Sequence, residues 1–311
     1  MSQQKKILVV YFTQTGQLRR IIDHVLAPVQ GNAVITYEEI VPVQPFPFPW
    51  SKQEFFDAMP ETVLGKPRGI QPLKVNPEEH FDLVIMAYQP WFLSPSQPVA
   101  AFLQSPEAAR LLKGKPVITL LGCRNMWLNA QEKTKKYLAG IGAHLVGNIV
   151  LVDKSPNLVS LITILRWTGK GKKDAFFIFP PAGVQEKEIL ESGRFAAPIL
   201  QALEQQQFDR LHEQLLALDS VELKPGLIVL ENRGRGPFRF WARFISAKGG
   251  PGDERRKGRV TMYRIVLLAA IPLLTPFTTI ASWLQLLFSR KQLEQDVTYY
   301  KGVQLRESIH S

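Results

Sequence analysis

The sequence predicts an α/β fold with a doubly wound parallel sheet, followed by a membrane-associated helical extension. Apolar runs that are continuous rather than alternating recur along residues 5–152, as in strands buried on both faces of a parallel sheet. Segments with helical spacing separate these runs, and the strand–helix alternation indicates right-handed crossovers. Beyond residue 155 the pattern changes to basic and apolar segments, which predicts the extension.

Each element follows from its own residues. The expected strands are rich in β-branched and aromatic residues and lie at 7–12, 33–40, 81–88, 115–121 and 144–152. Helical spacing predicts helices at 18–26, 99–103 and 130–141, and Pro28 ends the first of these. The stretch Pro42–Trp50 is too rich in proline and aromatic residues for regular structure, so it is expected to be a loop.

The chain is expected to divide into an α/β core and several shorter parts. Within the second half, a strand is expected at 176–179 and another at 227–230, with one or two helices over 189–218. The expected parts are a core at 1–155, an extension at 156–233 that completes or packs on the core, a basic Gly/Pro linker at 234–264, an apolar membrane-anchoring segment at 265–288 and a polar tail at 289–311.

Composition limits the classes of function. The chain has 311 residues and a formal net charge of +11, which suits an anionic partner. Much of the excess lies beside apolar C-terminal segments, which favours an anionic membrane surface over nucleic acid. The single cysteine, Cys123, excludes an intrachain disulfide and a cysteine-based zinc site, and no ligand spacing predicts a metal. The apolar run near the N-terminus is too short for a signal peptide, so we expect a cytoplasmic domain.

The loop Thr13–Gln17 joins the first strand to the first helix. Its backbone N–H groups lie at the positive end of the helix dipole, which attracts phosphate. Thr13, Thr15 and Gln17 add side-chain donors, and Gly16 allows a tight turn without a Cβ clash. The alternative is an ordinary Thr/Gly turn that caps a helix. The position directly after the first strand favours a phosphate site.

The residues Ile7–Gly16 resemble the opening of flavodoxins and flavodoxin-like NAD(P)H:quinone oxidoreductases, in which a Ser/Thr-x-Thr-Gly-x loop binds the phosphate of FMN. The resemblance covers roughly the first half of the chain. It implies a flavodoxin-like fold, FMN as cofactor and NAD(P)H as electron donor. The usual final Ser/Thr of the loop is a leucine here, which removes one hydroxyl. The phosphate-binding candidates are Thr13, Gln14, Thr15, Gly16, Gln17 and Leu18.

A second loop, Gln89–Ser96, follows a central strand, and ligands of open α/β sheets bind at the carboxyl ends of the strands. In the flavodoxin family the equivalent loop flanks the isoalloxazine ring. Trp91 and Phe92 offer flat apolar faces for stacking, and packing into the core or against a partner is the alternative. Nearby prolines stiffen the loop, which favours the ligand. The candidates are Gln89, Pro90, Trp91 and Phe92.

A third loop follows the strand at 115–121, where flavodoxins place a Gly-rich loop near the flavin ring. Gly122 and Cys123 match that pattern, whereas Arg124 and Asn125 depart from it; all four are cofactor-binding candidates. Arg124 is expected either to neutralise a reduced flavin or an anionic substrate, or to form a salt bridge within the loop. Cys123 is expected to be a small apolar filler, because the five histidines form no Cys–His pattern. No catalytic residue is identified.

The segment 265–288 carries no formal charge and exceeds the ~20 residues that cross a bilayer. Basic residues flank it on both sides. Pro272 and Pro276 each remove a helix hydrogen bond, so a kinked span, a re-entrant hairpin and an in-plane anchor stay open, and the basic flanks favour the last two. The apolar stretch 158–167 is either a second interfacial contact or a core helix. We expect the protein at the cytoplasmic face of a membrane, anchored through its C-terminal region.

Two functional hypotheses follow. The first is a membrane-associated, FMN- and NAD(P)H-dependent oxidoreductase acting on a lipophilic quinone, phenol or polyketide-like compound. The loops at 11–18 and 122–127 also resemble those of bacterial proteins labelled dialkylresorcinol condensing enzymes, which implies an accessory role in dialkylresorcinol or aryl-lipid biosynthesis. The second is a flavodoxin scaffold without flavin that serves as a membrane-docked binding or assembly factor. The sequence is compatible with an oligomer.

Overall fold

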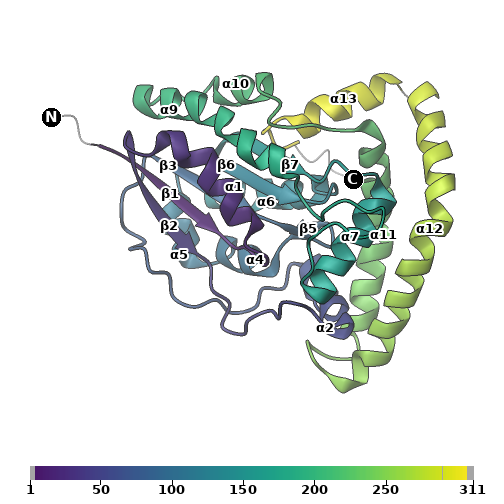
Figure 1. The fold of residues 1–311 in the computed structure, drawn as a ribbon. Coiled ribbons are helices and arrows are strands. Elements are labelled where there is room, and N and C mark those ends of the chain that lie inside the picture. The colour runs from purple at the N-terminus through teal and green to yellow at the C-terminus, as the bar shows by residue number, and fades with distance from the viewer. Residues whose placement is uncertain (1–3, 289, 307–311) are drawn as a thin grey trace.

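Five parallel strands form the central sheet of the protein (Figure 1). The structure is a computed structural model that describes residues 4–288 and 290–306, the side chains at 272, 274–288 and 290 excepted. The sheet order is β2-β1-β3-β6-β7, which in chain order of the five strands is 2-1-3-4-5, the flavodoxin-like arrangement. The predicted parallel α/β fold is therefore confirmed. The strands are β1 (Lys5–Tyr11), β2 (Ala33–Glu39), β3 (Leu83–Tyr88), β6 (Pro116–Cys123) and β7 (His144–Val152).

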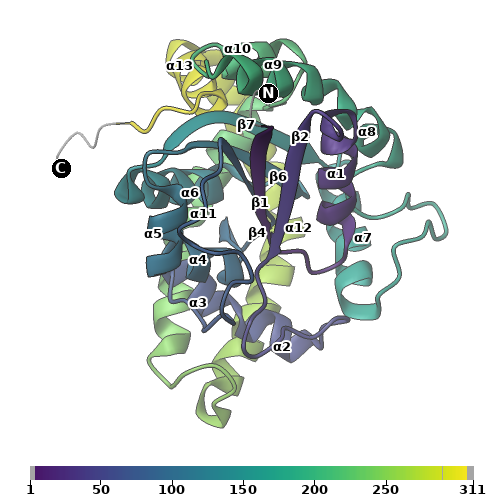
Figure 2. The same ribbon diagram turned by 90° about the vertical axis from the view of Figure 1, so that its left-hand side faces the viewer.

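Helices cover both faces of the sheet because alternate residues of each strand point to opposite sides. Ile7 and Val9 belong to one buried core, and Leu8 and Val10 belong to the other. The first core is closed by α1 (Gln17–Leu26), η1 (Ala27–Val29), α8 (Glu186–Leu190), η2 (Glu191–Phe195), α9 (Ala196–Gln205) and α10 (Leu211–Ala217). The second is closed mainly by α4 (Gln97–Leu103), α5 (Pro106–Leu112) and α6 (Leu128–Ile141), as Figure 2 shows.

Several short elements follow the strands and were not expected. The loop after β2 leads to α2 (Lys52–Asp57) and α3 (Met59–Leu64), and the loop after β3 contains the two-residue strands β4 (Pro90–Trp91) and β5 (Ser94–Pro95). The expected strand at 176–179 is only a single bridge between Phe176 and Phe179. Residues 157–170 form the helix α7 (Asn157–Lys170).

The helix α11 (Pro225–Ser246) corrects two expectations. Residues 227–230 are helical rather than a strand, and residues 234–246 are helical rather than a linker. Ile228, Glu231, Ala242 and Ile245 are buried along this helix, so tertiary packing outweighs the helix-breaking tendency of its glycines and proline. A Cβ at Gly234 would lie 3.3 Å from a methyl carbon of Leu93, so the glycine allows a close approach.

The helices η3 (Glu254–Arg256), α12 (Lys257–Phe288) and α13 (Arg290–Lys301) complete the chain that the structure describes. The backbone of α12 is one continuous helix, so residues 265–288 do not form a hairpin, but most side chains of this expected membrane segment lie outside the described residues. Among described residues, no helix has the length and apolarity needed to cross a bilayer. The expected polar tail folds back, since Leu293 of α13 is buried in the second core; residues 289 and 307–311 lie outside the description.

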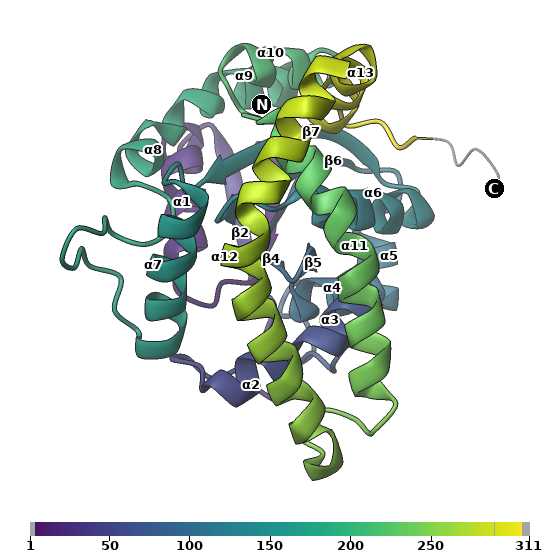
Figure 3. The same cartoon turned by 90° about the vertical axis from the view of Figure 1, so that its right-hand side faces the viewer.

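Three helices gather beyond the carboxyl ends of the strands: α7, α11 and α12 (Figures 1 and 3). The side chain of Arg124, just after β6, contacts Asn157 of α7, and Glu231 of α11 contacts the first residue of α6. Because this edge holds ligands in doubly wound folds, the second half of the chain forms one wall of the candidate site.

A fully buried arginine fixes α12 to α2 and α3. The Arg256 guanidinium donates from Nε to Asp57 Oδ1 at 2.6 Å and from Nη1 to Glu61 Oε1 at 2.7 Å, with no exposed side-chain surface. Burial opposes its charge, but the bonds to Glu61 and Asp57 hold the pKa of Arg256 above its ordinary value. Gly252 also donates its N–H to Asp57, so the turn before η3 is tied to the same carboxylate.

Replacing Arg256 with alanine should lower the free energy of unfolding by about 3–5 kcal/mol, because two buried carboxylates lose their counter-charge. Urea denaturation followed by circular dichroism measures this change. The matched control is Arg255→Ala, which removes an exposed neighbour whose partner is Asp253 and should change the unfolding midpoint little. Equal effects of the two substitutions would contradict the role given to Arg256.

Candidate functional site

The loop between β1 and α1 has the geometry of an anion site. Gly16 is the residue before the helix and has a left-handed backbone (φ 77°), and its N–H donates to Thr13 Oγ1 at 3.1 Å. A Cβ at Gly16 would meet nothing within 4 Å, so the space above the loop is open. The first turn of α1 carries no acidic residue. The first N–H groups of the helix therefore lie in a positive local field.

Gln14 joins this loop to two others. Its backbone N–H donates to Gln89 Oε1 at 3.2 Å, and its side-chain Nε2 donates to the carbonyl oxygens of Phe46 and Pro47 at 3.2 and 2.9 Å. The loops after β1, β2 and β3 thus meet at one point. Two candidates from the sequence, Gln14 and Gln89, are brought into direct contact.

Gln17 and Leu18 have structural side chains. Gln17 donates to the carbonyl of Val184 at 3.0 Å and accepts its N–H at 3.1 Å, so this amide pairs with a backbone segment rather than pointing to open space. Leu18 is fully buried in the first core. A Cβ on Gly122 would lie 3.4 Å from Leu18 and 2.9 Å from Ile21, which explains both the glycine and the apolar residue at the end of the loop. Only the backbone amides of Gln17 and Leu18 can therefore contribute to anion binding.

Trp91 is the centre of an aromatic cluster, which we define as Phe12, Phe46, Trp50 and Trp91. Its ring meets those of Phe12, Phe46 and Trp50 edge to face, with centroids 5.7, 5.0 and 5.5 Å away. Trp91 stays half-buried, while Phe46 and Trp50 are buried. The aromatic cluster closes the carboxyl edge beside Gln14, and Trp91 packs against this chain's own rings.

The turn between β4 and β5 is strained. Phe92 and Leu93 both have positive φ angles, 46° and 58°, in a two-residue connection that normally uses Asn-Gly. Such conformations cost about 1–3 kcal/mol each in bulky residues. Leu93 is buried against α11, and the Phe92 ring lies 5.0 Å from that of Phe55. Packing therefore offsets the strain and separates Phe92 from Trp91.

Arg124 lies among neutral acceptors. Its Nη1 donates to Asn157 Oδ1 at 2.8 Å, to the Asn157 carbonyl at 3.1 Å and to Ser160 Oγ at 3.3 Å. Among the described residues it forms no salt bridge, so the alternative of a salt-bridged loop arginine is wrong. Burial lowers the pKa of Arg124. Asn125 donates to the same Asn157 oxygen at 3.0 Å, while its own buried Oδ1 has no hydrogen-bond partner among the residues described.

Cys123 does not have the surroundings of a nucleophile. The side chain packs against the second core, and burial raises the pKa of the Cys123 thiol well above its ordinary value. A thiol held in this way stays protonated at neutral pH. Within the described residues, no three His, Cys, Asp or Glu side chains are grouped so as to hold a metal ion.

Glu231 of α11 is fully buried and caps another helix. Its Oε1 accepts the N–H of Leu128, and its Oε2 accepts both the N–H and the side-chain Nδ2 of Asn129, each at 3.0 Å. Burial raises the pKa of Glu231, and these hydrogen bonds counteract the rise. The carboxylate neutralises the free N–H groups at the start of α6 and fixes the end of the loop that carries Arg124.

Cationic side chains of α11 lie near Lys133 of α6. Lys133 of α6 donates to the Val63 carbonyl at 2.8 Å and to Ser94 Oγ at 2.6 Å. Burial, followed by the charges of Arg235 and Arg239, lowers the pKa of Lys133 to about 8. No salt bridge of Lys133, Arg235 or Arg239 occurs in the described part of the chain.

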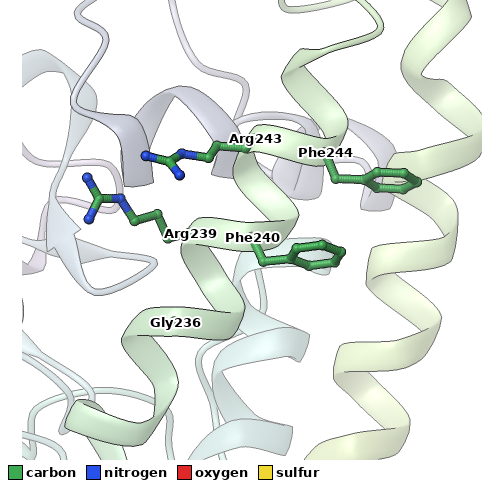
Figure 4. Close-up of a pocket in the computed structure, with 5 residues that line it drawn as sticks. All are labelled: Gly236, Arg239, Phe240, Arg243 and Phe244. Atoms are coloured by element: carbon green, nitrogen blue, oxygen red, sulfur yellow. The ribbon is translucent and has the colours of Figure 1, made fainter.

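A shallow groove of about 480 Å³ lies on α11 (Figure 4). Phe240 and Phe244 stack in parallel with ring centroids 6.0 Å apart and point toward α12, while Arg239 and Arg243 point the other way. The helix thus presents aromatic rings on one side and guanidinium groups on the other. Its lining residues are Gly236, Arg239, Phe240, Arg243 and Phe244.

The structure places the sequence candidates in two groups. The first group, at the loops after β1 and β3, contains Gln14, Gln89 and Trp91; the second, after β6, contains Arg124 and Asn125. Sequence reasoning missed four contributors to the site. The aromatic content of residues 42–50 could have signalled Phe46 and Trp50. Nothing in the sequence signalled Asn157 and Glu231.

Comparisons with known proteins find likeness in fold. No protein-family model matches the chain, and no curated protein matches it. A flavoprotein from Lactobacillus acidophilus NCFM, solved in complex with FMN, is 14% identical with a TM-score of 0.38, over 47% of this chain and 93% of that one. The Trp repressor binding protein from Bacillus subtilis is 13% identical with a TM-score of 0.30, over 53% of this chain and 98% of that one. In both cases about half of this chain is covered.

Glu231→Ala should lower the free energy of unfolding by about 2 kcal/mol, since the start of α6 loses its acceptor for three N–H donors. Urea denaturation measures the loss. Glu204→Ala, on the exposed face of α9, is the control and should leave stability unchanged. A Glu231 variant as stable as this control would show that water caps α6 equally well.

Lys133 should react with amine-selective reagents at an unusually low pH. Its labelling should reach half of its maximum near pH 8, whereas free lysines titrate near ~10.4. Peptide mapping by mass spectrometry across a pH series measures the midpoint. Arg239→Gln should move the midpoint upward, because it removes one of the three neighbouring positive charges, which are those of Arg235, Lys136 and Arg239 itself. An unchanged midpoint would show that the charge of Arg239 does not act on Lys133.

Proposed function

We propose that this protein is a flavodoxin-like flavoprotein that binds FMN at the carboxyl edge of its sheet and acts as an oxidoreductase. One observation carries the proposal: the Thr13–Gln17 loop lies between a buried strand and a helix, at the edge where the sheet order reverses. Gly16 has a left-handed backbone with open space above it, which fits a phosphate approaching the helix N-terminus.

The residues present fit the phosphate of FMN better than they fit its ring. The phosphate would be held by the Thr13 and Thr15 hydroxyls and by the backbone amides at the start of α1. The aromatic cluster beside Gln14 would border the ring and exclude water, and Arg124 would place a positive charge nearby. When bound, FMN supplies hydride and electron transfer, while the protein supplies binding, orientation and electrostatics.

The electron donor and acceptor belong to the same proposal. We propose NAD(P)H as donor and a lipophilic quinone, phenol or polyketide-like compound as acceptor. Exposed apolar side chains on α11 and α12, Phe240 and Ile265 among them, support a hydrophobic acceptor. The loops at 11–18 and 122–127 resemble those of bacterial proteins labelled dialkylresorcinol condensing enzymes, which supports a role in dialkylresorcinol or aryl-lipid biosynthesis.

A location at the cytoplasmic face of a membrane is also part of the proposal. Exposed apolar side chains recur along the described part of α12 at helical spacing: Met262, Ile265, Val266 and Leu273. Basic residues, Lys257 and Arg264 among them, lie on the same helix. An apolar stripe bordered by positive charge suits an anionic lipid surface.

A second candidate function is supported by the same loops. Trp91 packs against three rings of its own chain, and the Gln17 side chain is bound to Val184. Two side chains that were expected to contact flavin thus already have partners within the protein. This favours a flavodoxin scaffold that has lost flavin and serves as a membrane-docked binding or assembly factor.

Titration with FMN and with riboflavin, which lacks the phosphate, separates the two functions. The protein should quench the fluorescence of FMN, and FMN should bind at least about tenfold more tightly than riboflavin, because the loop recognises phosphate. Gly16→Val should abolish this preference. Failure to bind either compound would favour the scaffold without flavin.

The control variant for this titration is Gly31→Val. Gly31 also has a positive φ, 91°, and open space around its Cβ position, but it precedes β2 at the opposite edge of the sheet. Both substitutions impose similar backbone strain, so only a local effect on the phosphate loop can separate them. Circular dichroism verifies that both variants are folded. Equal loss of FMN in the two variants would contradict the phosphate site.

A further inference from the structure

A tight turn after α7 presents two large apolar side chains to solvent. Phe177 is 100% exposed and Ile178 is 91% exposed. They lie between Phe176 and Phe179, which exchange backbone hydrogen bonds of 3.1 and 2.9 Å and stack their rings with centroids 5.0 Å apart. We call residues 176–179 the aromatic turn. Phe177 has a positive φ of 49°, so its exposure comes with backbone strain.

The aromatic turn is braced rather than loose. Arg166 of α7 donates to the carbonyl oxygens of Lys172 and Asp174 at 3.1 and 2.7 Å and pairs with the Asp174 carboxylate at 3.0 Å. Its guanidinium also lies 4.4 Å from the ring centre of Phe176. The fold thus holds the tip in one position, although Phe177 and Ile178 bury almost no surface within this chain and so add little to its stability.

The apolar surface continues from the turn onto α7. Leu158 and Ile162 are both large, apolar and more than a third exposed. They precede Arg166 at intervals of four residues, so all three lie on one face of the helix. The exposed stripe of α7 therefore leads to the residue that braces the aromatic turn.

The charges around the turn are positive. Lys170 and Lys172 are exposed and form no salt bridge among the described residues, and Lys173 lies 5.6 Å from the Trp167 ring centre. Two acidic residues nearby, Asp174 and Glu186, are paired with Arg166 and Arg20 respectively. The surface beside the apolar tip therefore attracts anions.

We propose that the aromatic turn inserts into the headgroup region of an anionic lipid bilayer, with Phe177 and Ile178 in the acyl boundary and Lys170 and Lys172 at lipid phosphates. This contact is separate from α12. It rests on the proposed membrane location and adds a second point of attachment, at the edge of the sheet that holds the candidate flavin site (Figure 3).

Lipid fits the turn better than a protein partner does. Two protruding side chains offer far less than the roughly 800 Å² that each partner buries in a stable protein interface. The backbone N–H and C=O groups of Phe176 and Phe179 are already paired with each other, and those of Phe177 and Ile178 stay hydrated when the tip lies in the headgroup region. The flanking lysines match anionic headgroups.

Vesicle flotation with the full chain tests the proposal. Vesicles of phosphatidylcholine with phosphatidylglycerol should bind the protein, and vesicles of phosphatidylcholine alone should bind it more weakly. Phe177→Asp and Ile178→Asp should each reduce binding at least about tenfold, because each loses apolar insertion and gains a repelled charge. Lys170→Glu with Lys172→Glu should reduce binding to a similar degree.

Matched controls lie on surfaces away from the turn. Leu190→Asp replaces a 57% exposed leucine on α8, and Lys113→Glu with Lys187→Glu reverses two exposed lysines elsewhere; neither control should alter vesicle binding. Thermal unfolding verifies that every variant is folded. Ile265→Asp with Leu273→Asp tests α12 separately.

The outcomes are distinct. If the wild type binds vesicles and the turn variants bind equally well, the aromatic turn is not a lipid contact, although membrane association through α12 stands. If the wild type binds no vesicles, the lipid contact of the aromatic turn and the proposed membrane location are both wrong, while FMN titration still reports on the flavin site. If the turn variants instead abolish self-association in light scattering and leave vesicle binding unchanged, the turn is a protein interface and the proposal is overturned.

Discussion

The contact between Arg256 and the two carboxylates of Asp57 and Glu61 determines how the two halves of the chain are combined. Phe56 and Met59, which lie beside these carboxylates, pack with Ala242 and Tyr263 in a small core of their own. Apolar packing alone allows helices to slide, whereas a guanidinium with fixed donors accepts one register. The ion pairs therefore set where α11 and α12 stand relative to the sheet, and so which side chains reach its carboxyl edge.

The carboxyl edge is consequently assembled from both halves. The first half provides the Thr13–Gln17 loop, the aromatic cluster and Arg124. The second half provides Asn157, which orients Arg124, and Glu231, which fixes the start of α6. An α/β core of this topology usually leaves that edge open to a ligand. Here α7, α11 and α12 stand beyond it, so a ligand at this edge would lie against elements from both halves of the chain.

The sequence was informative wherever a residue's neighbours along the chain decide its environment. All five parallel strands were predicted, because a strand buried on both faces must be apolar throughout. The loop at 13–17 was predicted from its position between strand and helix. The helix α11 was not, because Gly234, Gly236 and Pro237 are typical of a loop, and only contacts with distant segments reveal why they are tolerated. Glu231 looked like any surface acid, since its partners are about 100 residues away.

The capping of α6 by Glu231 has a consequence for the order in which the protein can fold during synthesis. Residues 5–152 leave the ribosome first and contain every strand of the sheet, yet α6 has no acceptor at its start until residue 231 has emerged. The second core also waits for Leu293 of α13. The first core waits for α8, η2, α9 and α10 as well. Vectorial folding of the nascent chain therefore passes through a state in which part of this core is exposed, and such surfaces are the usual targets of chaperones. A fragment ending near residue 155 would retain that state permanently.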